Sequence, residues 1–359
     1  MKIFKKALSS IIIVIFTFSM FSALTTANVY ASETTVDGFT YTLLDDGTAK
    51  ITNFDIIDTT TDVVVPSEIN GYTVSAVSGF SYTDITSITL PSTLTSISYG
   101  AFENCKKLET AVIPDSIKTI EAFAFNDCES LKNITLPEGI ENIKHSAFSY
   151  CSSLEKVVFP STVKKLGSSS FASCTSLTEV ILPEGIEDIG AAFAHCTALE
   201  NIVIPSSIKC INSGTFYNCT SLVDVTLPEG LESIEAHAFT YCDSLASLTI
   251  PSTVTSISTN AFTYDVTFNG YAGTYIEEYV TLCNSDYGFE HTLVDITGLK
   301  GDINLDGVVN VKDATLLQKF LVELETLTNP QLLVADTTDN GRIDIKDVRY
   351  ILKTNADLV

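Results

Sequence analysis

The chain of 359 residues has no tryptophan and few basic residues, with 20 Lys and Arg against 44 Asp and Glu and a formal net charge of −24. It has no cluster of Lys or Arg, which argues against binding to nucleic acid or to anionic membrane surfaces. No H-x-x-H or C-x-x-C spacing occurs, which argues against a zinc site. The sequence also lacks a G-x-S-x-G motif, and its recurring acidic residues belong to repeated turns rather than to a carboxylate pair. Catalysis therefore has no support in the sequence.

The first 31 residues have the pattern of a secretory signal peptide. Lys2, Lys5 and Lys6 precede an apolar stretch from Ile11 to Leu24, and small residues follow as far as Ala31. Segments of this kind are removed during export. We expect cleavage after Ala31, secretion from a bacterial cell and no membrane insertion of the mature chain. A retained membrane anchor is the alternative.

A repeat fills the middle of the chain. Prolines recur every 23 residues, with a single step of 22, at positions 91, 114, 137, 160, 183, 205, 228 and 251. Aliphatic residues lie three and six positions after each proline, a phenylalanine follows, and each turn ends in L-x-x-[aliphatic]-x-[aliphatic]-P. A period of about 20 to 29 residues with such strands is typical of a leucine-rich-repeat solenoid, in which stacked turns share one core.

The complete pattern, P-x-x-[VI]-x-x-I-x-x-x-A-F-x-x-C-x-x-L-x-x-[IV]-x-L, resembles the BspA-type leucine-rich repeats of bacterial surface proteins. The resemblance implies a solenoid with a parallel β-sheet over residues 91–270. We expect residues 32–90 to form an N-terminal cap, with a hairpin around Asp45-Asp46-Gly47 and an irregular first repeat. Residues 271–296 are expected to form a C-terminal cap.

The strand residues between the buried aliphatics of a leucine-rich repeat face its concave side. One such column is β-branched here, and its middle, formed by Val158, Ile181 and Val203, is more apolar than its ends. Two interpretations remain open: good β-propensity on an exposed sheet, or a docking face for a protein or a glycan. Aromatic residues are absent from the column, so no sugar-stacking platform is evident there.

Seven of the nine cysteines occupy one equivalent position per turn, at residues 105, 128, 151, 174, 196, 219 and 242. Adjacent strands lie about 4.7–4.9 Å apart, and parallel Cβ atoms keep that separation, whereas a disulfide needs Cβ atoms that converge to about 3.5–4.5 Å. We therefore expect a ladder of reduced, buried thiols. Cys210 and Cys283 lie outside the ladder and are either free or paired.

Two twelve-residue segments near the C-terminus carry side chains with an oxygen atom at positions 1, 3, 5, 9 and 12, and each has glycine at position 6. Ca²⁺ takes about 6–8 oxygen ligands, and such a loop can wrap them around one ion, with a backbone carbonyl added at position 7. The predicted ligands of the first loop are Asp302, Asn304, Asp306, Val308, Asn310 and Asp313. Those of the second loop are Asp336, Thr338, Asn340, Arg342, Asp344 and Asp347.

A helical pattern follows each loop, at residues 314–321 and 348–353, whereas none precedes the first loop. Asp also replaces the Glu of an ordinary EF-hand at position 12. This tandem arrangement resembles the type I dockerin modules of polysaccharide-degrading complexes, over residues 297–359. The resemblance implies two Ca²⁺ ions and, as a partner, a cohesin domain of a scaffold protein.

The same resemblance places the cohesin contacts at loop positions 10 and 11 and about one helical turn farther on. These residues are Val311, Lys312, Lys319, Ile345, Lys346 and Lys353. The two halves match as pairs of a hydrophobic residue and a lysine. Their near-symmetry suggests that the module can dock in either of two orientations.

We therefore expect an α+β multidomain protein in which a leucine-rich-repeat solenoid precedes a small helical dockerin. The leading interpretation is a secreted, non-catalytic binding component of a cellulosome-like complex, on a free or cell-surface scaffold, whose solenoid binds a protein or a glycan. An adhesin or host-interacting repeat protein is the alternative. A weaker alternative is a carbohydrate-active hydrolase, because dockerins usually accompany such enzymes.

Overall fold

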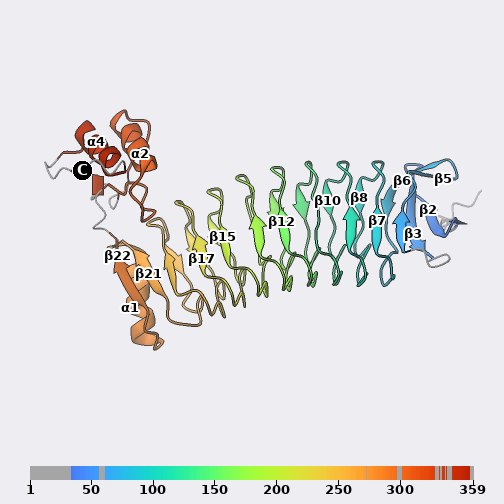
Figure 1. Ribbon diagram of the computed structural model, residues 1–359, viewed down its shortest axis with the longest axis horizontal. Helices are drawn as coiled ribbons and strands as arrows, with labels where there is room; N and C mark the ends of the chain where they lie inside the picture. Colours follow the sequence, from blue (N-terminus) through green and yellow to red (C-terminus); the bar gives the residue numbers. More distant parts are fainter. Residues whose placement is uncertain are drawn as a thin grey trace, which may run out of the picture. The chain divides into compact units, whose positions relative to one another are not determined.

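The structure is a computed structural model that describes residues 34–359 except 56–60, 272, 297–300, 328–330, 332–333, 336, 338–341 and 356–359. The predicted signal peptide lies outside the described residues. A parallel β-solenoid is followed in the chain by a small helical region, which confirms the predicted α+β class (Figure 1). Among the described residues, no helix is both long and apolar enough to cross a membrane.

The N-terminal cap contains three antiparallel strand pairs, formed by β1 with β2, β2 with β3 and β5 with β6. Strands β2 and β3 pair antiparallel around the turn that contains Gly47, whose φ of +82° suits glycine, and this confirms the hairpin that the sequence predicts. Strand β3 then pairs in parallel with β6, which leads into the repeats. The strands of this cap are β1 (Thr34–Val36), β2 (Phe39–Leu43), β3 (Ala49–Phe54), β5 (Glu68–Ile69) and β6 (Tyr72–Val77).

Each turn of the solenoid contributes to two ladders of short parallel strands. In the first ladder the middle residue of most three-residue strands is buried and its neighbours are exposed, because successive side chains of a strand point to opposite faces. Its strands are β4 (Asp62–Val64), β7 (Ser87–Thr89), β9 (Thr110–Val112), β12 (Lys156–Val158), β14 (Glu179–Ile181), β15 (Asn201–Val203), β17 (Asp224–Thr226) and β19 (Ser247–Thr249).

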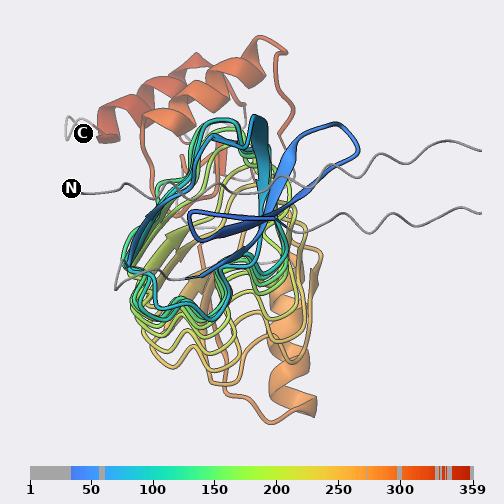
Figure 2. The ribbon, with the colours of Figure 1, turned by 90° about the vertical axis from the view of Figure 1, so that its right-hand side faces the viewer.

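The second ladder consists of two-residue strands that follow each proline turn. Its strands are β8 (Ser96–Ile97), β10 (Thr119–Ile120), β11 (Asn142–Ile143), β13 (Lys165–Leu166), β16 (Cys210–Ile211), β18 (Ser233–Ile234) and β20 (Ser256–Ile257). Viewed from the end, the turns lie one behind another (Figure 2). The aliphatic residues that the repeat pattern selected point into one continuous core.

A column of stacked phenylalanine rings runs through this core. Ring centroids of neighbouring turns lie 5.0 Å apart for Phe102 and Phe125 and 5.1 Å apart for Phe148 and Phe171. The spacing widens to 6.0 Å on both sides of Phe193. That turn is one residue short, and β13 and β16 on either side of it belong to different sheets. The missing residue thus loosens the regular stacking locally.

The seven ladder cysteines are buried beside this column, and each thiol donates a hydrogen bond to a phenylalanine carbonyl of the preceding turn. In the middle of the solenoid the Sγ of Cys151 lies 3.3 Å from the carbonyl oxygen of Phe125. The Sγ of Cys174 lies at the same distance from that of Phe148. All nine cysteines are free thiols in the structure. The ladder therefore packs as small buried groups that satisfy backbone acceptors.

The solenoid ends in β21 (Thr267–Gly270), α1 (Tyr275–Asp286) and β22 (Thr292–Asp295). Helix α1 buries Ile276, Tyr279, Val280 and Cys283. Farther along the chain, α2 (Val311–Leu321) and α4 (Ile345–Asn355) follow the two loops that the sequence singled out. A second hydrophobic cluster, separate from the solenoid core, contains Tyr271, Ile303, Leu305, Ala314, Leu317, Val334, Ala335, Val348 and Ile351.

Candidate functional site

The first twelve-residue loop is held by its own carboxylates. Asp302 is fully buried, and its two carboxylate oxygens accept hydrogen bonds from the backbone N–H groups of Asp306 at 3.1 Å and Gly307 at 2.8 Å. Its Oδ2 also lies 3.3 Å from the hydroxyl of Tyr271, which donates to it. Gly307 has a φ of +83°, so the sharp turn at position 6 uses the freedom of glycine.

The end of the loop forms the start of helix α2. Asn310 caps the helix by accepting the N–H of Lys312 at 2.8 Å, and Asp313 reaches back to accept the N–H of Asn310 at 2.7 Å. This reciprocal pair is a capping box, in which two otherwise unpaired donors of the helix end are satisfied. Asp313 also accepts the N–H of Asn304 at 2.9 Å, which ties position 12 to position 3.

The electrostatics of this loop favour a cation. The pKa of Asp302 is raised to about 6, mainly by burial and also by the nearby carboxylates of Asp313 and Asp306, against hydrogen bonds from Gly307 and Asp306 that lower it. Burial likewise raises the pKa of Asp313. A bound divalent cation would stabilise the ionised forms of all three carboxylates.

The donor set fits calcium rather than zinc. Within the described part of the chain, no three His, Cys, Asp or Glu side chains converge closely enough to hold a metal ion by themselves. A bound ion would therefore also need the side-chain oxygens of Asn304 and Asn310 and the carbonyl of Val308. Neutral oxygens mixed with carboxylates are the ligands that Ca²⁺ takes in proteins.

The second loop repeats this geometry where it is described. Asp347 accepts the N–H of Asp344 at 2.8 Å, and Asp344 accepts the N–H of Lys346 at 2.7 Å. These bonds match those of Asp313 and Asn310 in the first loop. Arg342, which is predicted to coordinate the ion through its backbone carbonyl, also lies in the described part. The other three predicted ligands, Asp336, Thr338 and Asn340, lie outside the described residues.

The predicted cohesin contacts lie on the surfaces of α2 and α4. Val311 is 55% exposed and Ile345 is 58% exposed, although both are apolar. Each is followed by an exposed lysine, Lys312 or Lys346, and Lys319 and Lys353 are exposed one to two turns farther along their helices. Lys319 lies 3.5 Å from Glu325. The buried residues Leu317 and Ile351 face the small core instead.

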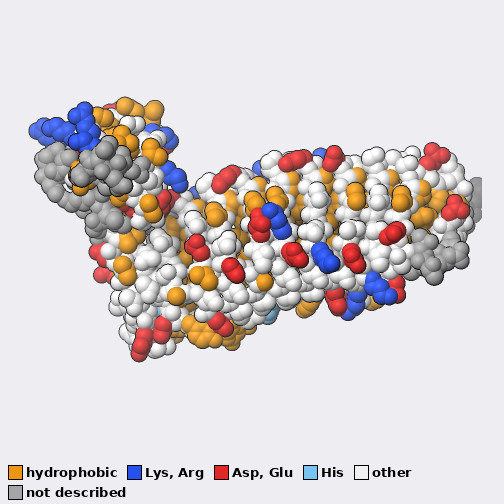
Figure 3. Space-filling view, viewed as in Figure 1, with side chains coloured by type: hydrophobic (Ala, Val, Ile, Leu, Met, Phe, Trp, Pro, Cys, Tyr) orange, Lys and Arg blue, Asp and Glu red, His pale blue; other side chains and the backbone are white. Residues whose placement is uncertain are grey.

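The predicted strip on the solenoid is exposed on the first strand ladder. Val158 is 45% exposed, Ile181 46% and Val203 64%. Hydrophobic side chains appear at intervals along this face (Figure 3). Beside the strip, Lys156 and Glu179 of neighbouring strands form an ion pair at 2.6 Å, which places opposite charges across the ladder.

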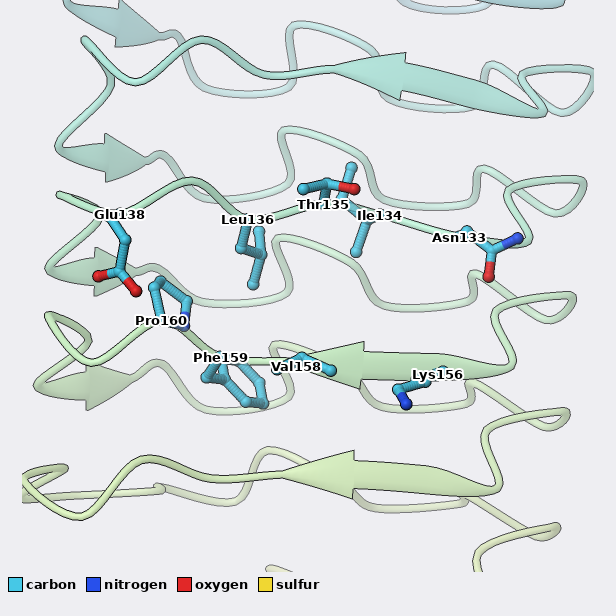
Figure 4. Close-up of a pocket in the computed structure, with 9 residues that line it drawn as sticks. All are labelled: Asn133, Ile134, Thr135, Leu136, Glu138, Lys156, Val158, Phe159 and Pro160. Atoms are coloured by element: carbon cyan, nitrogen blue, oxygen red, sulfur yellow. The ribbon is translucent and has the colours of Figure 1, made fainter.

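A shallow pocket of about 440 Å³ opens on the same face. Figure 4 shows Asn133 and Lys156 at one end and Glu138 at the other, with Thr135 and Val158 between them. Its floor is apolar and its ends are polar. Nothing in its lining forms a nucleophile with an adjacent base, so the pocket suits binding rather than catalysis.

Comparison with known proteins agrees with both parts of the structure. The model of the BspA-type leucine-rich-repeat region matches residues 76–191 and 143–269, and that of the type I dockerin domain matches residues 300–354. No curated protein matches the chain.

The solenoid resembles several solved structures, among them the following two. A leucine-rich repeat protein from Bacteroides ovatus is 27% identical with a TM-score of 0.61, and the match covers 67% of this chain and 66% of that one. A leucine-rich cell surface protein from Faecalibacterium prausnitzii is 26% identical with a TM-score of 0.52, covering 64% of this chain and 73% of that one. The chain belongs to the BspA-type leucine-rich-repeat family and carries a C-terminal type I dockerin domain.

Proposed function

We propose that this protein is a secreted, non-catalytic binding component of a cellulosome-like complex. Its dockerin attaches it to a cohesin of a scaffold protein, and its solenoid binds a protein or glycan target. The observation that carries the proposal is the duplicated loop and helix. Each half presents an exposed hydrophobic residue followed by a lysine, Val311-Lys312 and Ile345-Lys346, at positions 10 and 11 of a calcium-type loop.

Calcium has a structural role in this proposal. The helical module has a small core, and small domains of this size commonly need a metal for stability. Two Ca²⁺ ions, one per loop, would fix the starts of α2 and α4 and thereby position both docking pairs. The cohesin surface that receives them would be apolar at the centre and acidic at the rim.

Leucine-rich-repeat and dockerin domains are both non-catalytic, which favours a binding role over hydrolysis. The adhesin alternative draws support from the cell-surface relative of Faecalibacterium prausnitzii and from the exposed strip of Val158, Ile181 and Val203. Both functions use the solenoid for recognition, and they differ in what holds the protein at the cell surface.

Affinity capture from the native secretome distinguishes the two. The immobilised full chain should recover a cohesin-bearing scaffold protein in the presence of calcium and lose it when a chelator is added. Recovery of no cohesin-bearing protein, with calcium bound to the bait, would favour the adhesin. Hydrolysis of a polysaccharide by the purified chain would favour the enzyme.

A further inference from the structure

The loops that precede the first strand ladder form the lower edge of the solenoid in Figure 1. Two residues after each phenylalanine of the stacked column from Phe80 to Phe239, these loops place a residue in the left-handed region, with φ between 60° and 63°. The residues at this position are Tyr82, Asn104, Asp127, Tyr150, Ser173, His195, Asn218 and Tyr241. Asn and Asp adopt this conformation readily, whereas bulky residues such as Tyr adopt it rarely.

The backbone N–H at this position bonds to the next turn whether the residue is a tyrosine or an asparagine. The N–H of Tyr150 donates to the carbonyl of Ala172 at 2.8 Å, and the N–H of Asn218 donates to that of Thr240 at the same distance. An asparagine therefore makes the same bond between turns as a tyrosine. Tyrosine at this position adds backbone strain without adding a hydrogen bond between turns. This points to a role for its side chain outside the fold.

The aromatic side chains are exposed and partly grouped. Tyr150 is 57% exposed and Tyr241 is 41% exposed. The rings of His195, Tyr217 and Tyr241 lie in a row over three turns, with centroids 5.2 Å and 5.4 Å apart. The amide of Asn218 lies 3.1 Å from Nδ1 of His195. In Figure 3 hydrophobic side chains also gather along this lower edge.

Four consecutive turns of the edge are uncharged although the protein is strongly acidic, and the turn of Tyr241, which follows them, carries one acidic residue, Asp243. Residues 149–153, 172–176, 194–198 and 217–221, the loops of four consecutive turns, contain no Asp, Glu, Lys or Arg. They consist of Ser, Thr, Tyr, Asn, His, Ala and the buried ladder cysteines. The preceding turns are charged, and there Lys106 pairs with Glu129. The neutral stretch therefore begins abruptly within an otherwise equivalent row of loops.

We propose that this edge binds a neutral carbohydrate chain running along the solenoid, with sugar rings against Tyr150 and Tyr241. Aromatic faces offer apolar contact, and the surrounding hydroxyl and amide groups can donate and accept hydrogen bonds. Equivalent loops, repeated once per turn, match a polymer of repeated units. The absence of charge in the four loops disfavours anionic polymers, which would require Lys or Arg. A protein partner is disfavoured because the loops lack arginine and large aliphatic residues.

The proposal rests on the proposed binding role of the solenoid and names its ligand class, but it uses the loop edge instead of the strand face. It is tested with the full secreted chain, loaded with calcium and without cohesin. The probes are xylan, glucomannan and mixed-linkage β-glucan, with polygalacturonate as the charged comparison. Affinity electrophoresis and calorimetry measure binding.

The test variant carries Tyr150→Asn and Tyr241→Asn, because asparagine accepts the left-handed conformation. The matched control is Tyr82→Asn, which has the same φ and loop position but lies three turns before the neutral stretch, whereas Tyr150 lies in it and Tyr241 in the turn directly after it. We expect at least one neutral polysaccharide to bind, the double variant to lose at least tenfold in affinity, and the control to bind as the wild type does. The melting temperature of the double variant should equal or exceed that of the wild type.

Four outcomes would overturn the proposal. The wild type could bind none of the neutral polysaccharides, or it could bind polygalacturonate more tightly than all of them. The double variant could bind as well as the wild type, in which case a polysaccharide-binding solenoid would use another surface, such as Val158, Ile181 and Val203. A lower melting temperature for the double variant would show that the tyrosines serve the fold. None of these outcomes bears on cohesin binding. The dockerin part of the proposed function is therefore tested separately, by capture of a cohesin-bearing protein.

Discussion

The rings of Phe125 and Phe148 lie parallel at the centre of the solenoid, with centroids 5.2 Å apart and an interplanar angle of 2°. Both side chains are fully buried, and each also stacks on a phenylalanine of the turn beyond. In a repeat protein each turn is stabilised mainly by its two neighbours. A central phenylalanine therefore contributes to two interfaces between turns.

The first prediction concerns this column. Phe148→Ala should lower the free energy of unfolding of the solenoid by about 3–5 kcal/mol, because it removes a fully buried ring and leaves a cavity. Phe148→Leu should cost less, since it keeps most of the volume. Urea unfolding followed by circular dichroism measures both. A loss below about 1 kcal/mol for the alanine variant would contradict the importance of the column.

The second prediction concerns the thiols. Burial raises the pKa of Cys196 to about 12 and that of Cys151 well above its usual range. Because the thiolate is the reactive form, the ladder cysteines should not react with a thiol reagent at pH 8 in the native protein. In denaturant without reductant, at least seven cysteines should react. Three or more disulfides would contradict the ladder geometry.

The repeat explains why so much of the fold could be predicted from the sequence. Leu94, Ile97 and Phe102 recur with their equivalents at a fixed period, and each such position has one environment in every turn. One correct assignment therefore holds for the whole solenoid. Outside the repeats, the structure confirms the predicted hairpin and the helix that follows each of the two loops.

Other features could not be predicted because they depend on backbone conformation. The row of left-handed residues was not detected, since Tyr150 and Tyr241 alternate with Asn, Asp and Ser and show no conserved type. The environment of His291 depends on how α1, β21 and β22 pack on the last repeat, and these elements do not follow the period of the repeats. The strip of Val158, Ile181 and Val203 is exposed as predicted, but the sequence left its role open, and its function stays a prediction.

The third prediction is a pH dependence of the C-terminal cap. His291 is buried among aromatic rings, and its Nδ1 accepts the N–H of Val266 at 3.1 Å. Its Nε2 is buried and has no hydrogen-bond partner among the residues that the structure describes. Burial lowers the pKa of His291 below its usual 6.5, against a smaller opposing effect of Asp265. The neutral ring is therefore the form that the folded cap accommodates.

Because the folded pKa lies below the unfolded one, this contribution to stability is complete above pH 6.5 and declines as the pH falls toward the folded value. The melting temperature of the calcium-loaded protein should decrease between pH 7.5 and 5.5, and His291→Gln should remove much of that slope. Identical slopes for the two proteins would show that His291 does not control acid stability.

The fourth prediction concerns calcium. Equilibrium dialysis should find two ions per chain, with weaker binding in the second loop, where Thr338 stands at a position usually held by Asn or Asp. At a free concentration about a thousandfold above the dissociation constant, one ion stabilises the folded module by about 4 kcal/mol. Chelation should therefore unfold α2 and α4 in preference to the solenoid. Zero or one bound ion, or an unchanged helical signal, would contradict this.

The fifth prediction concerns orientation in docking. Changing Val311 and Lys312 to Asp should leave cohesin binding nearly intact, because the module can turn and use Ile345 and Lys346. Changing all four should abolish binding, since unpaired charges buried against an apolar patch cost several kcal/mol. Calcium content must be measured in each variant, because both pairs lie within the loops. Loss of all binding in the first variant, with two ions still bound, would establish a single orientation.

The central claim is that calcium-dependent docking to a cohesin places this protein in a larger complex. Calorimetric titration of the calcium-loaded full chain against a panel of cohesins from the same organism tests it most directly. The expected result is one cohesin bound per chain for at least one member of the panel, with binding abolished by a chelator. Failure to bind any cohesin while two calcium ions are held would contradict the claim.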